Sequence, residues 1–329
     1  MRRRVLFFII CLIAAACTPE PKRGDSPDPI KIKEHINFLA SDEMQGRGTG
    51  SEGNRRAAEY IADHFDNYRL APKGTQGYFQ PFTAKVTKVS VADSIRPARN
   101  VIGFLDNGAE YTIVIGAHYD HLGEGRQGSS KDPDPEGKIH NGADDNASGV
   151  AGLLEMARYF TSGTIKESYN FLFIAFSAEE LGLVGSGYFT DHPTIPLNSI
   201  NFMLNMDMIG RYNPERGLGI GGYGTSPSWP AIFEGVKGSE GEKGKGGQEG
   251  KIKFFTDPAG SGGSDHGSFY AKNLPVLFFH TGGHPDYHMP GDDIGKVDVK
   301  AEAAILEIGI RLIENAMELP KLEFKTSEP

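Results

Sequence analysis

The feature that most constrains the fold is an alternation of short apolar runs with helical segments, which begins near residue 99. Short runs rich in β-branched and aromatic residues predict strands, and strands that alternate with helices indicate an α/β sheet with helices on its faces. The expected helices in this part are 147–160 and the amphipathic segment 299–317. The expected strands are 100–105, 111–117, 170–177, 200–206, 252–256 and 275–280.

Two further helices are expected before the alternation begins. They span 30–40 and 52–68, the second with Ser51 as its N-cap, and they frame a polar loop. The Gly-, Lys- and Glu-rich stretch 235–250 is typical of a mobile surface loop rather than of a domain boundary. Residues 30–329 are therefore expected to form a single domain.

The first residues read as an export signal. Three arginines at 2–4 precede only twelve apolar residues, a run too short to span a bilayer as a mature helix, so 1–16 is predicted to be a signal peptide. Small residues directly before Cys17 resemble the bacterial lipoprotein processing site, where that cysteine is acylated. An ordinary secretory signal with an incidental cysteine is the alternative. The prolines of 17–29 favour a flexible tether, so we expect an exported lipoprotein, anchored by lipid to the membrane and facing the periplasm or cell exterior.

The positions of the cysteines and the net charge limit the metal ligands and the partners that the domain can have. Both cysteines, Cys11 and Cys17, lie in this N-terminal segment, so any metal in the domain must be held by histidines and carboxylates. The chain has 43 acidic residues against 34 Lys and Arg, a net charge of −9. Nucleic acid is not an expected partner, because phosphate-backbone binding requires a clustered basic surface.

Unusual polar residues follow several predicted strands. His118 and Asp120 follow one strand, where a carboxylate can orient a metal-binding imidazole. The doublet Asp144–Asp145 precedes a predicted helix, and an N-cap role is the alternative. In open α/β sheets, sites collect at the carboxyl ends of strands, so these residues are candidates for one site.

More acids follow the later strands. Glu179 and Glu180 end one apolar run, where they repel each other unless a cation compensates; a solvated turn is the alternative. Asp207 lies between two methionines at the end of a buried run, where a carboxylate needs a metal or an arginine. His288 supplies a second histidine. Two histidines with three or four carboxylates and no cysteine favour a divalent metal, especially zinc.

Five motifs in this order resemble those of the co-catalytic di-zinc aminopeptidase family, whose relatives include bacterial leucyl aminopeptidases, glutamate carboxypeptidase II and glutaminyl cyclase. The resemblance runs from about residue 35 to the C-terminus and implies a three-layer α/β/α fold of the zinc-dependent exopeptidase type, with a mixed, mostly parallel central sheet. The motifs are GAHYDH (116–121), GADDNASG (142–149), FSAEELGLVGS (176–186), NMDMIGR (205–211) and DYHMPGDD (286–293).

The resemblance also implies roles for individual residues. Asp145 would bridge two Zn²⁺ ions, with a cis bond to Asn146. Glu179 falls on the general base, and Tyr287 on a residue that stabilises the oxyanion. Asp120 matches the acid behind a histidine ligand, and Asp265 belongs to a Ser-Asp-His segment that lines or supports the site. The implied zinc ligands are His118, Asp145 and Asp207 for one ion, and Asp145, Glu180 and His288 for the other.

The implied activity is that of a metallo-aminopeptidase, which hydrolyses N-terminal residues from peptide substrates through a zinc-activated water. A glutaminyl-peptide cyclase of the same fold is an alternative, less favoured because the full ligand set is present. A carboxypeptidase is another, although no Arg-rich pocket signature is visible. A non-catalytic binding module is the third. The sequence does not decide whether three further histidines line the pocket or pack in the fold: His121, His280 and His284. The oligomeric state is not predicted.

Overall fold

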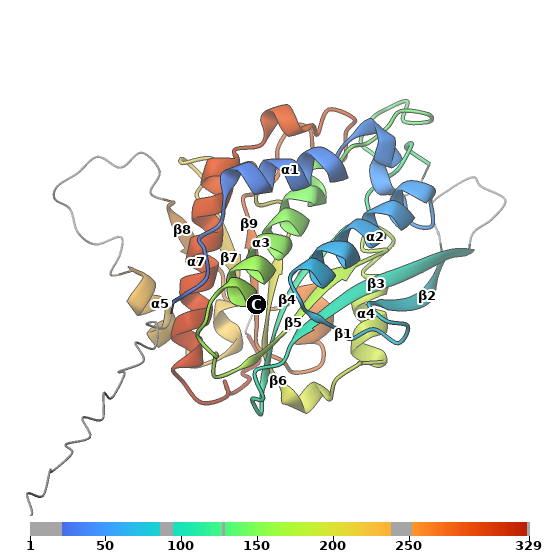
Figure 1. The fold of residues 1–329 in the computed structure, drawn as a ribbon. Coiled ribbons are helices and arrows are strands. Elements are labelled where there is room, and N and C mark those ends of the chain that lie inside the picture. The colour runs from blue at the N-terminus through green and yellow to red at the C-terminus, as the bar shows by residue number, and fades with distance from the viewer. Residues whose placement is uncertain (1–21, 86–94, 127–128, 238–251, 328–329) are drawn as a thin grey trace, which may run out of the picture.

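The computed structural model describes residues 22–85, 95–126, 129–237 and 252–327 (Figure 1). The predicted signal peptide 1–16, Cys17 and most of the 235–250 stretch lie outside these residues. Within the described part, no helix has the length and apolar character that a membrane crossing requires.

A mixed sheet of nine strands, counted over the described residues, forms the centre of the molecule. Its strand order is β1-β3-β5-β4-β6-β9-β7-β8, with β2 also paired to β3. The four central strands β5, β4, β6 and β9 are parallel, whereas β3 and β7 pair antiparallel on either flank. The strands are β1 (Ala71–Pro72), β2 (Phe79–Lys85), β3 (Ile95–Leu105), β4 (Thr112–His118), β5 (Asn170–Phe176), β6 (Ile200–Met206), β7 (Leu218–Gly221), β8 (Phe254–Thr256) and β9 (Val276–His280).

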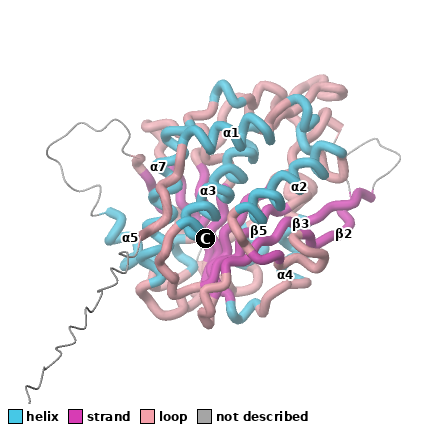
Figure 2. Tube along the Cα trace, viewed as in Figure 1, coloured by secondary structure: helices cyan, strands magenta, loops and turns pink. Residues whose placement is uncertain are grey.

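Helices cover both faces of the sheet, so the expected three-layer arrangement is observed (Figures 1 and 2). Alternate residues of β4 divide between the layers: Ile113 and Ile115 pack against one set of helices and Val114 against the other. One face carries α1 (Pro29–Leu39), α2 (Glu52–Asn67), α3 (Gly149–Ser162), α5 (Trp229–Lys237) and α7 (Val299–Met317); the other carries α4 (Val184–Asp191) and α6 (His266–Tyr270).

Local signals explain the helix starts that the sequence predicts. The Ser51 side chain accepts a hydrogen bond from Asn54 N at 3.1 Å and caps α2. Asp298 caps α7 by accepting from Lys300 N and Ala301 N. The central strands β4, β5 and β6 are buried along their whole length, as parallel strands covered on both faces must be.

The structure describes residues 22–28 of the tether expected for 17–29, and this part is hydrogen-bonded to α3 and to the residues after it. Lys22 N donates to Thr164 Oγ1 at 2.8 Å, and Asp28 N donates to Glu155 Oε2 at 2.7 Å. Backbone N–H groups of this segment are therefore satisfied by the domain, which fixes the entry into α1.

The topology gathers the candidate residues at one edge. The carboxyl ends of β4, β5, β6 and β9 point the same way because these strands are parallel. His118 is the last residue of β4, Glu179 follows β5 and Asp207 follows β6 directly. Asp145 lies in the turn that leads into α3, so four separate segments converge at this edge.

Candidate metal centre

One group of possible ligands forms around His118. Its Nε2 atom lies 3.4 Å from Asp145 Oδ1 and 3.4 Å from Asp207 Oδ1. One ligand atom from each of these three residues lies within 4.8 Å of the others, a spacing compatible with a shared metal ion. The His118 side chain is 1% exposed, so this group is shielded from bulk water.

A second group lies on the other side of Asp145. Asp145 Oδ2 is 3.1 Å from His288 Nε2, and Glu180 Oε2 is 3.3 Å from the same nitrogen. Asp145 thus directs one carboxylate oxygen to each group, which is the arrangement that a bridging ligand needs. The donors are imidazole and carboxylate only, a set that suits zinc.

His121, left open in the sequence, belongs to this second group: one ligand atom each from His121, Asp145 and Glu180 lie within 4.8 Å of one another. Its Nδ1 atom lies 2.7 Å from Glu180 Oε1 and 3.9 Å from Asp145 Oδ2. Its place after His118 and Asp120 in the GAHYDH segment was the available signal. Sequence spacing alone did not show that its ring turns toward Glu180 rather than into the core.

The charges of the cluster are unbalanced without a cation. Burial raises the pKa of Glu179 and of Glu180 well above the usual carboxyl value, and neighbouring carboxylates add to the effect. Burial opposes ionisation of Asp145 as well, but three nearby histidines hold its pKa well below the usual value. Buried carboxylates this close together are typical of a site that binds metal.

Asp120 lies behind His118 as expected, but its contacts differ in detail. The His118 Nδ1 atom is 3.2 Å from the Asp120 backbone oxygen and 3.9 Å from its carboxylate. The carboxylate instead accepts from Glu179 N at 3.0 Å and from Thr49 Oγ1 at 3.1 Å. The backbone oxygen of Asp120 therefore orients the imidazole, while its side chain holds the Glu179 segment.

The Asp145 turn is held by a carboxylate that the sequence did not single out. Asp292 is buried and accepts from Asp144 N at 3.0 Å and from Asp145 N at 3.0 Å. The peptide bond between Asp145 and Asn146 is cis, as the resemblance implies. Asp144 itself turns away from the two groups, because its Oδ1 accepts from Gly210 N at 2.7 Å.

Arg47 is a second residue that sequence reasoning missed. It is fully buried, and burial lowers its pKa to about 10. Its guanidinium donates to the backbone oxygens of Tyr119 (2.8 Å), Asn141 (2.7 Å) and Gly142 (2.9 Å). Arg47 therefore joins the loop after β4 to the turn before Asp145.

The Ser-Asp-His segment lies beside Asp207. Ser264 Oγ donates to Asp207 Oδ2 at 2.7 Å and accepts from Asn205 Nδ2 at 2.8 Å. Asp265 is fully buried, and burial raises its pKa to about 7. Ser264, rather than Asp265, makes the direct contact with the candidate ligand.

The expected catalytic side chains border the cluster. Glu179 Oε2 lies 4.0 Å from His118 Nε2, outside both ligand groups. The Tyr287 ring stacks on the His288 ring with centroids 3.9 Å apart, and burial together with the nearby carboxylates raises the Tyr287 pKa.

The other two histidines whose roles the sequence did not decide make their contacts outside both ligand groups. His284 Nε2 contacts Asp144 Oδ2 at 3.2 Å, and His280 stacks on Phe278.

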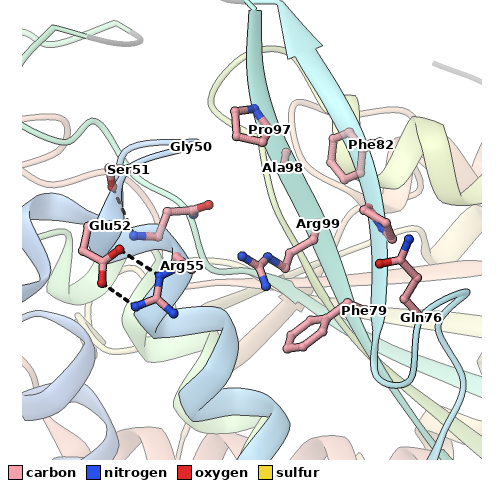
Figure 3. Close-up of a pocket in the computed structure, with 12 residues that line it drawn as sticks. Gly50, Ser51, Glu52, Arg55, Gln76, Phe79, Phe82, Pro97, Ala98 and Arg99 are labelled. Atoms are coloured by element: carbon pink, nitrogen blue, oxygen red, sulfur yellow. Dashed lines mark hydrogen bonds and ion pairs between the residues drawn. The ribbon is translucent and has the colours of Figure 1, made fainter.

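Two of the cavities in the described part of the chain are lined by none of the candidate ligands. One of about 410 Å³ lies between the start of α2 and the β2–β3 hairpin (Figure 3). In it Arg55 is bonded to Glu52, while the Arg99 guanidinium lies over the Phe79 ring, 4.9 Å from its centroid. The second, of about 300 Å³, is lined by Leu122 and Gly123 among others.

Solved structures share this fold at low sequence identity. Glutaminyl cyclase from Bacteroides thetaiotaomicron superposes with a TM-score of 0.67 at 17% identity, over 89% of this chain and 99% of that chain. BSAP, a zinc aminopeptidase from Bacillus subtilis, gives 0.67 at 16% identity, over 90% and 96%. Both confirm the predicted α/β fold class.

Curated relatives are similar in sequence. The uncharacterized protein YfbL of Escherichia coli (strain K12) is 25% identical over 78% of this chain and 82% of its own length. Aminopeptidase YwaD of Bacillus subtilis (strain 168) is 32% identical over 55% of this chain and 36% of its own. The chain spans about a third to a half of the length of the first aminopeptidases it matches. The model described as peptidase family M28 matches residues 100–313, more than half of the sequence. The protein therefore belongs to peptidase family M28.

Proposed function

We propose that the protein is a di-zinc aminopeptidase that removes N-terminal residues from peptides. The observation that carries this proposal is the position of Asp145, whose two oxygens lie 3.4 Å from His118 and 3.1 Å from His288. His118 and Asp207 would hold one ion with Asp145, and Glu180 and His288 the other. When bound, zinc acidifies a water and polarises a carbonyl group.

The residues around the cluster fit the proton transfers of amide hydrolysis. Glu179 is buried, and its raised pKa suits a base that takes a proton from the attacking water and returns it to the leaving amine. Its backbone N–H is held by Asp120, so its position is fixed. The Tyr287 hydroxyl would donate a hydrogen bond to the developing oxyanion.

The similarity to aminopeptidase YwaD and to the zinc aminopeptidase BSAP supports this activity. Glutaminyl-peptide cyclisation is the second candidate, favoured by the equal TM-score with a glutaminyl cyclase. The two reactions differ in their use of water. Hydrolysis consumes one water molecule, whereas cyclisation of an N-terminal glutamine needs no water and releases ammonia. A carboxypeptidase or a binding module has less support.

The test combines metal content with three substrate types. Purified protein is assayed for bound zinc and for turnover of aminoacyl-nitroanilides, of their N-acetylated forms and of peptides with N-terminal glutamine. We expect about two zinc ions per chain and cleavage that requires a free amine. Glu179→Gln should abolish cleavage and keep the metal; Glu215→Gln, at an exposed position, is the matched control. Cyclisation without hydrolysis would overturn the proposal.

We also propose that the protein is exported and lipid-anchored through Cys17. The support is the order of arginines, twelve apolar residues and small residues before this cysteine. Fatty-acid labelling in a bacterial host should mark the wild type and not Cys17→Ser. A labelled C17S variant, or a mature chain that begins elsewhere, would contradict the anchor.

A further inference from the structure

Lys131 is fixed next to the candidate centre by a backbone contact. Its N–H donates to the backbone oxygen of His288 at 2.9 Å. The neighbouring Ser129 contacts His288 Nδ1 through its backbone oxygen at 3.0 Å. The segment that carries Lys131 is thus tied to the same residue that completes the second ligand group.

The ammonium group of Lys131 lies over an aromatic ring of the site. Its Nζ atom is 4.1 Å from the centroid of Tyr287, whose ring stacks on His288. A cation–π contact at an exposed position contributes about 0.5–1 kcal/mol, enough to bias where the side chain lies. The positive charge is therefore directed to the rim of the centre.

This charge has no acidic partner in the described part of the chain: no carboxylate there forms an ion pair with Lys131. Lys138, in the same loop, differs because its Nζ binds Asp132 at 2.9 Å. The ammonium of Lys131 therefore places a positive charge at the rim that none of the described carboxylates pairs with.

We propose that Lys131 is a specificity-determining residue that binds a carboxylate carried by the residue after the scissile bond. The inference rests on the proposed function. Because the N-terminal amine of a substrate is a cation that Lys131 would repel, the proposal assigns Lys131 to the leaving-group side of the scissile bond. Consecutive Cα atoms are about 3.8 Å apart, so a carboxylate on the residue after the scissile bond lies one residue from the reacting carbonyl. The preferred substrates are dipeptides with a free C-terminus and peptides with Asp or Glu as second residue.

The experiment compares substrate pairs that differ by one negative charge. One pair is Xaa-Gly and Xaa-Gly-amide, the other Xaa-Asp-amide and Xaa-Asn-amide, with the best-cleaved Xaa kept constant. For the wild type we expect kcat/KM to favour the charged member about three- to fivefold, mainly through KM. Lys131→Met should bring the ratio to about one, Lys131→Arg should keep it and Lys131→Glu should reverse it. Lys138→Met is the control and should keep the ratio.

The outcomes separate the inference from the proposed function. A response in the first pair alone assigns the site to the terminal carboxylate, and a response in both extends it to acidic side chains; either supports the proposal. Equal rates within each wild-type pair, or an equal loss on both members in K131M, would overturn it, because a residue that only supports Tyr287 does not change the ratio. If the wild type cleaves neither these peptides nor nitroanilides, the proposed function fails and the inference fails with it.

Discussion

Asp292 holds the backbone of Asp145, with a carboxylate oxygen 3.0 Å from the Asp145 nitrogen. The same carboxylate accepts from Asp144 N, so two consecutive N–H groups depend on one buried side chain. The position of the candidate bridging ligand is thus set by a residue far away in the sequence.

Replacing Asp292 should therefore weaken both the fold and metal binding. Asp292→Ala leaves two buried N–H groups unpaired, and we expect a loss of about 2–4 kcal/mol in the free energy of unfolding with less than two zinc ions bound. Asp292→Asn keeps one acceptor oxygen and should lose less. Urea unfolding and metal analysis measure both effects. An alanine variant with unchanged stability and full zinc would contradict this role.

Arg47 should matter mainly for stability. Arg47→Met removes donors from four buried backbone oxygens, those of Leu39, Tyr119, Asn141 and Gly142, and we expect a loss of about 3 kcal/mol or more. Arg69→Gln, at an exposed position, is the control and should change stability by less than about 0.5 kcal/mol. The measurement is chemical unfolding of the holoprotein. Equal effects of the two variants would show that the guanidinium does not brace these loops.

The elements with continuous apolar patterns were predictable. The bounds of β6 (Ile200–Met206) and α7 (Val299–Met317) match the prediction, because burial on both faces or along one stripe leaves a direct trace in the sequence. The strand β2 was not predicted: Pro81 is tolerated only because the strand lies beside β3 at the sheet's flank.

Residues with local motifs were predictable, and residues that act through distant contacts were not. His118, Glu180 and Asp207 follow strands and meet because parallel strands end at one edge. Arg47 and Asp292 contact backbone atoms some 70 to 150 positions away, and no spacing in the sequence records such contacts. For the same reason, the orientation of His121 toward Glu180 could not be predicted from the sequence.

A pH effect on stability should come from His35. Burial, aided by His64 nearby, lowers its pKa to about 3. Below about pH 6.5 the His35 imidazole is protonated in the unfolded chain but stays neutral in the folded chain. The free energy of unfolding therefore falls as pH drops from about 6.5 toward 3, by up to about 1.4 kcal/mol per pH unit. His35→Gln should flatten this slope, whereas His192→Gln, at an exposed position, should not. Denaturant unfolding between pH 4 and 7 compares the slopes; parallel lines for wild type and H35Q would rule the effect out.

The two histidines near Glu180 should differ in their effect on metal content. His288 Nε2 lies 3.1 Å from Asp145 and 3.3 Å from Glu180, whereas His121 Nδ1 lies 2.7 Å from the other oxygen of Glu180 and 3.9 Å from Asp145. His288→Gln should reduce bound zinc from about two ions to about one, and His121→Gln should retain most of both. Metal analysis after dialysis at matched free zinc measures this. The reverse order of losses would exchange the roles of the two residues.

Metal removal should destabilise the protein more at neutral than at acidic pH. In the metal-free fold, burial raises the pKa of Glu179 and Glu180, so the folded chain holds protons that the unfolded chain has lost above about pH 4.5. The two glutamates therefore destabilise the metal-free fold increasingly as pH rises, whereas bound cations compensate the ionised carboxylates. The difference in Tm with and without a chelator should be larger at pH 7.5 than at pH 5.5. His35 affects both forms alike and cancels in this difference. An equal Tm difference at the two pH values would mean that the carboxylate cluster does not depend on the cation for its charge balance.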